Sequence, residues 1–363
     1  MMIKAKLGLT VVLALAAFPA LAQQMSAKAE LLGSITLPTG LIIAGEELGG
    51  ISGLDYNAAT DTYYAISDDR SQRAPARFYA LKLAIDAEGV HSIDIVASHL
   101  LRTASGNIYP ENGIDPETIR FDAARKSVFW ASEGDAGGNP GVYESRMDGT
   151  FLRAFDVPSY YLPNADKTAG VYGNLAFESL AISGDDTMLY AGTENALAQD
   201  GPKATLETGS KARIIGFDIA SGEPKVEYVY ETGPIFKKAT AEPNYNDNGM
   251  SEFLLLDATH FLAVERSFGS GLGNEINFYV ADIEGATDVS GKQTIAGLDV
   301  VPLARQLVLK IGEGDFGLDI DNIEAITFGP EIDGSQTVVI ASDNNFNADG
   351  QFTQFVAFKV TMN

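Results

Sequence analysis

Five pairs of polar residues recur along this chain, and each pair brackets two strand-like runs. Nine of the ten members are acidic, and a serine takes the remaining place. The pairs are Ser52 and Asp68, Glu117 and Glu133, Glu178 and Glu194, Glu252 and Glu265, and Glu324 and Asp343. Between the members of each pair lie an apolar run, a turn rich in Asp, Gly, Asn or Thr, and a second apolar run, which is the pattern of a β-hairpin. Because the first residue of one hairpin strand lies beside the last residue of its partner, we expect both members of a pair at the same end.

The repetition predicts an all-β fold, a β-propeller of four-stranded blades. Each unit continues into two further strand-like runs, except that the last unit has only three runs, at 325–328, 337–342 and 353–360. The run 30–37 belongs to no unit. We expect it to supply the missing outer strand and to close the ring, which removes exposed sheet edges. We count five blades; the alternative is a six-bladed ring with a degenerate blade in 285–301.

The units are longer than the roughly 40 to 50 residues of a compact blade, so the excess is expected in loops. The longest insertions are 103–116, 158–173 and 233–249, and each precedes the first member of a pair. All three should therefore lie on the face that carries the paired acids, where long loops often carry binding and catalytic residues. We expect 30–363 to form a single propeller domain.

The N-terminus has the pattern of a secretory signal peptide. Lys4 and Lys6 precede an apolar stretch at 7–18, and Ala20 and Ala22 form a small-x-small cleavage pattern. The stretch is shorter than the ~20 residues of a membrane span, and no Cys follows for a lipid anchor. We therefore expect residues 1–22 to be removed, and the mature protein to be periplasmic or secreted without stable membrane insertion.

The composition narrows the class of partner. The formal charge is −24, and the chain has no Cys. Nucleic acid and anionic membranes would be repelled, and disulfides and thiolate metal sites are excluded. Such a charge suits a protein that binds divalent cations, although it could equally serve solubility. We expect a monomer that acts on a small anionic substrate such as a phosphate ester.

If the five units close around an axis, nine carboxylates meet at one end. Crowded carboxylates cannot all ionise cheaply, and a hard cation such as Ca²⁺, the cofactor we expect, would offset their repulsion. We assign metal binding to Asp68, Glu117, Glu133, Glu194, Glu265 and Asp343. We assign the general base to one of Glu178, Glu252 and Glu324. Additional oxygens could come from Asp115, Asn174, Asn248, Asp321, Asn322 and Asn344. The structural alternative is that each acid binds backbone amides of the next blade and only holds the blades together.

Two arginines closely follow acids of the pairs. Arg70 and Arg266 are therefore candidates for binding a phosphate through bidentate guanidinium contacts, although they could instead pair with Asp69 and Glu265. The chain has no G-x-S-x-G motif, and its three His residues lie on an outer strand or in a turn, so a serine-hydrolase triad is not supported.

The same segments resemble a known family. They are Gly50 to Tyr56, Tyr64 to Arg70, Phe177 to Ala181, Ser251 to Leu254 with Val264 to Arg266, and Asn322 to Glu324 with Ser342 to Phe346. In this order they are similar to the family called esterase-like activity of phytase, over nearly the whole chain from about residue 31. The resemblance implies a bacterial exported propeller whose Glu and Asp residues carry phosphodiesterase chemistry of the phospholipase C-like kind. Ser52 departs from the Glu of the other units.

The sequence thus favours a calcium-dependent phosphoric ester hydrolase, of a phytase-like or phosphodiesterase-like kind. Two alternatives remain open. One is a calcium-dependent lactonase or sugar-acting hydrolase, since a carboxylate site with calcium can also activate water against carbonyl groups. The other is a non-catalytic exported propeller that serves as a binding or scaffold protein.

Overall fold

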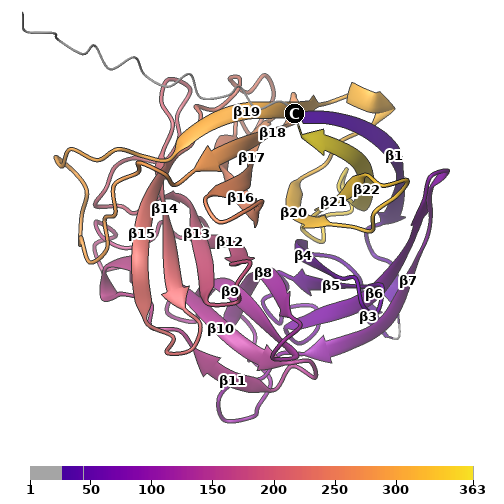
Figure 1. Ribbon diagram of the computed structural model, residues 1–363, viewed down its shortest axis with the longest axis horizontal. Helices are drawn as coiled ribbons and strands as arrows, with labels where there is room; N and C mark the ends of the chain where they lie inside the picture. Colours follow the sequence, from indigo (N-terminus) through magenta and orange to yellow (C-terminus); the bar gives the residue numbers. More distant parts are fainter. Residues whose placement is uncertain (1–26, 44, 363) are drawn as a thin grey trace, which may run out of the picture.

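Five antiparallel sheets of four strands surround a central axis in the computed structural model, which describes residues 27–43 and 45–362 (Figure 1). Blade 1 contains β4 (Ile51–Asn57), β5 (Thr62–Ser67), β6 (Arg77–Asp86) and β7 (Gly89–Leu100). Blade 2 contains β8 (Ile114–Asp122), β9 (Ser127–Asp135), β10 (Gly141–Arg146) and β11 (Phe151–Ala154). Blade 3 contains β12 (Phe177–Ile182), β13 (Met188–Ala196), β14 (Lys211–Asp218) and β15 (Pro224–Glu231). The predicted signal peptide, 1–22, lies outside the described residues.

The last two blades complete the ring. Blade 4 contains β16 (Asn246–Leu255), β17 (His260–Gly269), β18 (Gly273–Asp282) and β19 (Ala304–Gly312). Blade 5 contains β20 (Ile323–Phe328), β21 (Gln336–Ser342), β22 (Phe352–Met362) and β1 (Ala27–Pro38). A small hairpin of β2 (Ile42–Ile43) and β3 (Glu46–Glu47) and the 3-10 turns η1 (Ser159–Tyr161) and η2 (Asp315–Gly317) are the remaining elements of the described chain. This confirms the prediction of a five-bladed propeller.

The N-terminal strand closes the ring, as the missing strand of the last unit predicted. β1 pairs antiparallel with β22, so that Ala27 lies opposite Met362 and Pro38 lies opposite Phe352. Two ends of the chain therefore share one sheet, and blade 5 gains its outer strand from residues far away in sequence (Figure 1). The strand begins at Ala27, three residues before the predicted run.

The segment 285–301 contains no strand, which rules out a sixth blade there. It is an insertion between β18 and β19, and it runs beside the outer strand of the neighbouring blade 3. Val289 N donates to Glu227 O at 2.7 Å, and the apolar side chains of Val289 and Ile295 pack on Val229. The extra length of blade 4 is therefore a covering loop.

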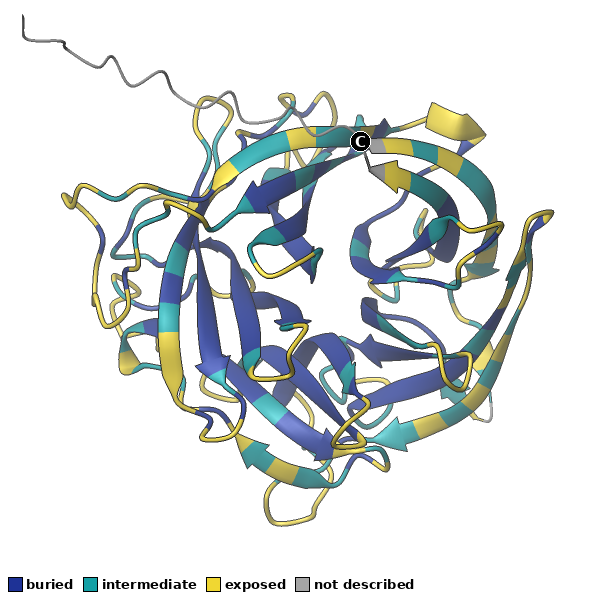
Figure 2. Cartoon of the chain, viewed as in Figure 1, coloured by how far each residue is buried: buried dark blue, intermediate teal, exposed yellow. Residues whose placement is uncertain are grey.

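Six clusters of buried apolar side chains form the hydrophobic core of the described chain, and five of them lie in the five interfaces between neighbouring blades, one in each. For example, Trp130 of blade 2 packs with Ile66 and Phe78 of blade 1, and Phe253 of blade 4 packs with Ile214 of blade 3. Inner and middle strands are buried, whereas the outer strands alternate between partly buried and exposed residues (Figure 2). The sequence pattern follows this arrangement, because a strand covered on both faces needs apolar residues on both.

The connections at the end of the axis where the inner strands begin are long, as predicted. They include the three insertions before β8, β12 and β16, and also the segment 197–210 between β13 and β14, which the sequence had not singled out. Within the described residues, no helix is long and apolar enough to cross a membrane.

Candidate functional site

Each inner strand carries a β-bulge in its pairing with the second strand, near the same end of the axis. In blade 1, Ile51 pairs with Ser67 and Gly53 pairs with Ile66, so the ladder steps over Ser52. The residues stepped over in the five inner strands are Ser52, Glu117, Glu178, Ser251 and Glu324. A bulge turns a side chain out of the alternation of the strand, and bulges are frequent beside active sites. On each second strand, the residue before the bulge has a pairing partner, and we consider the residue that directly follows this partner. We call these five residues and the five bulged residues the ring positions.

Blade 4 differs from the prediction by one residue in each strand. Met250 pairs with Glu265, and Glu252 pairs with Val264. The ring positions of this blade are therefore Ser251 and Arg266. Of the predicted pair, Glu252 lies one residue after Ser251, and Glu265 lies one residue before Arg266. The cause is the bulge on Ser251, which puts this residue in the place that the spacing of acids assigns to Glu252.

Glu252 lies in the packed centre of the propeller, where the other blades have Gly53, Thr118, Ser179 and Ala325. Its side chain is fully buried. Glu252 Oε2 lies 2.9 Å from Arg120 Nη2, and Thr118 Oγ1 donates to it at 2.5 Å. The backbone amide of Leu180 donates to Oε1 at 3.0 Å. Glu252 thus joins blades 2, 3 and 4, which is the arrangement of the structural alternative.

Glu265 also lies apart from the other acids. It is buried between blades 3 and 4, where it accepts hydrogen bonds from Tyr230 Oη at 2.8 Å and from the Gly233 amide at 2.8 Å. It also forms an ion pair with Arg305. The structure therefore separates Glu252 and Glu265 from the group of acids with which the sequence had placed them.

Seven carboxylates do occupy ring positions at the same end of the axis. We call them the acidic ring: Asp68, Glu117, Glu133, Glu178, Glu194, Glu324 and Asp343. Six of the seven, all but Glu133, line a cavity of about 120 Å³ together with Arg70 and Arg266. Glu133 lines an adjoining cavity of about 290 Å³ that also contains Arg70 and Asp115. The strand pairs thus bring seven of the nine predicted acids together.

Burial and mutual repulsion raise the pKa values of the carboxyl groups in the acidic ring. Burial, followed by repulsion from Glu324 and Asp115, raises the pKa of Asp68 to about 8. Burial raises the pKa of Glu194 to about 8, although Arg266 opposes the rise. The pKa values of Glu117, Glu133, Glu178 and Asp343 are raised well above their usual range by burial and then by neighbouring carboxylates. Without a cation, Asp68 and Glu194 are therefore expected to hold protons at neutral pH.

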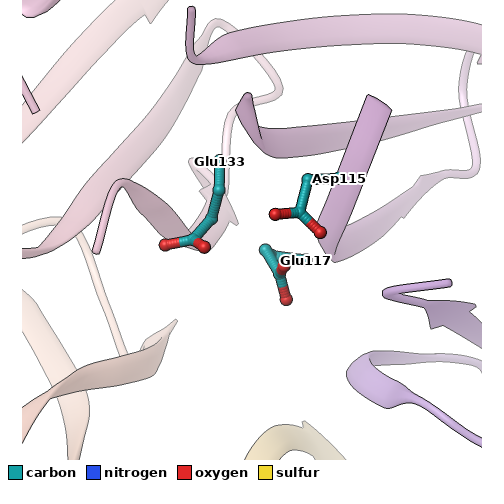
Figure 3. Close-up of side chains that lie close together, drawn as sticks. All are labelled: Asp115, Glu117 and Glu133. Carbon is teal, nitrogen blue, oxygen red and sulfur yellow. The ribbon is translucent and has the colours of Figure 1, made fainter. Parts of the chain in front are cut away.

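One sector of the ring fits a metal ion. Asp115, Glu117 and Glu133 each offer an oxygen within 4.8 Å of the others, and their carboxyl groups face one another (Figure 3). Asp115 Oδ1, Glu133 Oε2 and the nearby Asp68 Oδ1 are buried and have no hydrogen-bond partner among the described residues. An unpaired buried carboxylate oxygen is costly. A set made only of carboxylate oxygens suits Ca²⁺.

A second trio overlaps the first. Oxygens of Glu133, Glu178 and Glu194 also lie within 4.8 Å of one another. Glu133 is common to both trios, and its Oε1 accepts a hydrogen bond from the Ala176 amide at 2.7 Å. That bond fixes the carboxylate while its other oxygen stays free for a ligand. Asp115, which the sequence had offered only as an additional oxygen donor, is a full member of the site.

Arg266 supplies the ring with an internal positive charge. Its Nη2 lies 3.4 Å from Glu194 Oε1 and 3.7 Å from Glu324 Oε1, and its Nη1 lies 3.4 Å from Asp247 Oδ2. These contacts with three carboxylates leave little of its charge for a substrate. The sequence pattern missed Asp247, because this residue belongs to no pair. It enters the site because β16 begins at Asn246, several residues before Glu252, the first acid of the predicted pair.

Arg70 is the more accessible of the two predicted arginines. Its side chain is 42% exposed, its Nη2 lies 2.5 Å from Asp115 Oδ2, and it also donates to Asn174 Oδ1. Arg70 lines both cavities of the ring. It therefore borders the candidate metal site and keeps a face open to solvent, as a substrate-binding arginine would.

Glu324 lies on the other side of the same cavity. Ser52 Oγ donates to its Oε2 at 3.2 Å, and Asn322 Nδ2 donates to its Oε1 at 2.9 Å. Burial raises the pKa of Glu324, while Arg266, Asn322 and Ser52 act to lower it. Glu324 is thus oriented by neutral donors, and it lies outside both carboxylate trios.

The other predicted oxygen donors have structural partners. Asp321 accepts the Phe352 amide at 2.8 Å, Asn344 accepts the Gly50 amide at 2.9 Å, and Asn248 donates to Gly233 O at 2.9 Å. These contacts hold the loops around the ring. The residue Gly50 has φ of 64°, and a Cβ there would lie 2.0 Å from Asp68 Oδ1, so the backbone approaches the ring closely.

Comparison with known proteins places the chain in a family. The chain is 27% identical over 225 residues to an uncharacterized secreted protein of Arthroderma benhamiae. The aligned region covers 53% of this chain and 42% of the relative. The chain thus spans less than half the length of that relative. Among solved structures, the Dos1 propeller aligns with a TM-score of 0.36 and 10% identity, over 91% of this chain and 70% of the other. The family model Phytase-like, described as esterase-like activity of phytase, matches residues 46–346. Because this match spans most of its length, the chain belongs to the family described as esterase-like activity of phytase.

Proposed function

We propose that the protein is an exported, calcium-dependent hydrolase of phosphate esters, with its active site at the acidic ring. The observation that carries this proposal is the set of three buried and unpartnered carboxylate oxygens, on Asp68, Asp115 and Glu133. Buried polar atoms without a hydrogen-bond partner are rare in native proteins, because each one lowers the stability of the fold by about 1–3 kcal/mol or more. A bound divalent cation would satisfy them.

The proposed cation site consists of Asp115, Glu117 and Glu133, with Asp68 beside it. When bound, Ca²⁺ would neutralise the crowded carboxylates and polarise a phosphoryl oxygen. Glu133 would keep its orientation through the Ala176 amide.

Arg70 would bind the phosphate of the substrate. Its guanidinium borders the proposed cation site, is partly exposed, and presents planar donors that match two phosphate oxygens. Asp115 and Asn174 would hold this guanidinium in place. Arg266 would instead stabilise the ring, because its charge is already shared among Glu194, Glu324 and Asp247.

Glu324 would be the general base. It faces the same cavity as Arg70, and the hydrogen bonds from Ser52 and Asn322 orient its carboxylate. A base needs to be ionised at the working pH, and the nearby guanidinium of Arg266 favours that state. Glu178 fits the role less well because it belongs to a carboxylate trio, and Glu252 because it holds blades 2, 3 and 4 together.

The direct test is turnover of phosphate esters by purified protein with and without Ca²⁺. We expect calcium-dependent hydrolysis of bis(p-nitrophenyl) phosphate or p-nitrophenyl phosphate that is lost in Glu324→Gln. A lactone panel measured alongside tests the rival hydrolase: turnover of lactones but not of phosphate esters would replace the proposed substrate class. Calcium binding without turnover of either panel would favour a binding or scaffold protein.

A further inference from the structure

A larger cavity adjoins the acidic ring between blades 4 and 5. Its volume is about 620 Å³, and it shares Asp247, Arg266 and Glu324 with the small cavity of the ring. Because the two cavities share side chains, a substrate whose reacting group lies at the ring would place the rest of its structure in the larger cavity. The residues that line this cavity therefore indicate what the rest of the substrate is.

The charge of the larger cavity disfavours an anionic ligand. Six carboxylates line it: Asp247, Glu313, Asp319, Asp321, Glu324 and Asp349. Its one basic side chain is that of Arg266, which already contacts three carboxylates. A second phosphate, and still more a polyphosphorylated ring, would be repelled here.

Amide side chains argue against an ammonium or quaternary ammonium group as the ligand. Asn274, Asn345, Asn347 and Gln351 line the cavity beside the carboxylates. An amide both donates and accepts hydrogen bonds, whereas an ammonium group can use only acceptors and a quaternary ammonium group uses neither. Hydroxyl groups, which also donate and accept, match a mixture of amides and carboxylates.

Asn274 supplies a second, independent observation that points to a ligand in this cavity. This residue is only 7% exposed and lines the cavity, and its Oδ1 has no hydrogen-bond partner among the described residues. Its backbone amide is held by Glu313 Oε1 at 3.1 Å, so the position of the residue in the wall is fixed. A hydroxyl group in the cavity would supply the missing donor.

The wall of the cavity also includes an aromatic platform. Tyr245 is 52% exposed, and its ring centroid lies 6.2 Å from that of Phe268. The Tyr245 hydroxyl donates to Asp247 Oδ2 at 2.9 Å, which fixes the orientation of the ring. An exposed aromatic face beside hydrogen-bonding groups can cover the apolar C–H face of a sugar or a cyclic polyol.

We propose that the larger cavity binds an uncharged polyhydroxylated group, a sugar or a polyol, which is the alcohol component of a phosphodiester substrate. The link to a phosphodiester rests on the proposed function, whereas the ligand class of the cavity rests on its own side chains. The substrate therefore carries a single phosphate at the ring and hydroxyl groups in the larger cavity. Fully phosphorylated inositol would be repelled from the larger cavity.

Direct binding tests the ligand class without any need for catalysis. Methyl glucoside, myo-inositol, choline and inositol hexakisphosphate would each be titrated into the calcium-treated protein and followed by nuclear magnetic resonance. We expect a neutral polyol to bind, and Tyr245→Ala to weaken that binding by at least about tenfold. Tyr245→Phe keeps the aromatic face and should retain most of the binding. Binding of choline or of the hexakisphosphate in place of both neutral compounds, or no binding of either neutral compound, would overturn the proposal.

Asn274→Leu separates a ligand-binding role from a structural one. Because Oδ1 has no partner in the protein, its removal should leave the melting temperature unchanged or higher while polyol binding falls about tenfold. Tyr228→Ala, on outer strand β15, is the control and should leave binding unchanged. A lower melting temperature with intact polyol binding in Asn274→Leu would contradict the proposal.

Turnover distinguishes failure of this inference from failure of the proposed function. Absence of bis(p-nitrophenyl) phosphate hydrolysis, with polyol binding retained, would remove only the proposed function. Hydrolysis of that ester without any preference for phosphodiesters of sugars or polyols, combined with no polyol binding, would remove only the assignment of the larger cavity.

Discussion

Glu252 and Arg120 form a fully buried ion pair, with 2.9 Å between Oε2 and Nη2, that joins the inner strands of blades 2 and 4. Arg120 Nη1 also donates to Leu54 O of blade 1 at 3.0 Å, and Arg120 Nη2 donates to Phe253 O of blade 4 at 3.0 Å. With the Leu180 amide of blade 3, which donates to Glu252 Oε1, the pair connects four blades at the centre of the propeller. Loss of one partner would leave a buried charge uncompensated.

This contact predicts opposite outcomes for two Glu→Gln variants. Glu252→Gln should lower the free energy of unfolding by about 3–5 kcal/mol, because Arg120 stays buried without its partner. Glu324→Gln should lose activity while keeping or raising the melting temperature, because it removes one charge from the acidic ring. Urea denaturation and turnover of the two purified variants test this. A stable, inactive Glu252→Gln would instead make Glu252 the general base.

Arg266 is expected to stabilise the ring in the absence of a metal ion. Arg266→Gln removes the guanidinium from between Glu194, Glu324 and Asp247, and it should destabilise the chelator-treated protein by about 3–5 kcal/mol. Added Ca²⁺ should restore more stability to this variant than to the natural protein, because the cation then replaces the missing charge. Thermal denaturation with and without Ca²⁺ measures the difference. Equal calcium effects in the two proteins would mean that Arg266 and the cation act on separate groups of acids.

Arg70 should affect substrate affinity and have little effect on stability. Its side chain is 42% exposed, so Arg70→Gln should cost less than about 1 kcal/mol of stability. KM for a phosphodiester should rise about tenfold or more, and Arg70→Lys should recover only part of the loss because lysine cannot make a bidentate contact. Steady-state kinetics of the two variants provide the measurement. An unchanged KM in Arg70→Gln would exclude this arginine from substrate binding.

The raised pKa values predict how the stability of the metal-free protein depends on pH. Asp68 and Glu194 each have a pKa of about 8 in the folded state, against ordinary values of 3.8 and 4.5. Between those ordinary values and about 8, the folded state binds protons that the unfolded state does not. Their contribution to stability is therefore fully present below about pH 4 and is lost as the pH rises through about 8.

The chelator-treated protein should consequently melt at a higher temperature at about pH 5.5 than at about pH 8.5. A double variant, Asp68→Asn with Glu194→Gln, serves as the control and should depend less on pH over that range. Melting curves in chelator at several pH values decide the matter. A natural protein that becomes more stable as the pH rises would show that these carboxylates are ionised in the metal-free fold.

The sequence contained most of the fold and part of the site. The five strand pairs and the unpaired run before blade 1 led to the ring and to its closure by β1, because both depend on local alternation and turns. The sequence pattern could not locate the bulge of blade 4, because the position of this bulge depends on how the inner strands pack around the axis. Alignment of the apolar neighbours would have helped: Ile51-Ser52-Gly53-Leu54 matches Met250-Ser251-Glu252-Phe253, which places Ser251 at the ring position and Glu252 beside it.

Other parts of the site depend on long-range approach. Asp247 contacts Arg266 only because β16 extends beyond its apolar run, and Asp115 joins the cluster because the β8–β9 ladder is interrupted on both sides of Pro116. The larger cavity is assembled from blades 4 and 5 together with the loop 343–351. Regular spacing does not encode the first two contacts, because they depend on strand extension and irregular pairing within one blade. It does not encode the larger cavity, because the walls of that cavity come from different blades.

The central claim is that the acidic ring binds a divalent cation. The most direct measurement is the calcium content and melting temperature of the mature protein before and after chelation, with a Glu117→Gln and Glu133→Gln double variant measured alongside. We predict stoichiometric Ca²⁺, a melting temperature that falls on chelation and returns when calcium is restored, and loss of both effects in the double variant. A natural protein with no bound calcium and the same melting temperature in chelator and in excess Ca²⁺ would contradict the account.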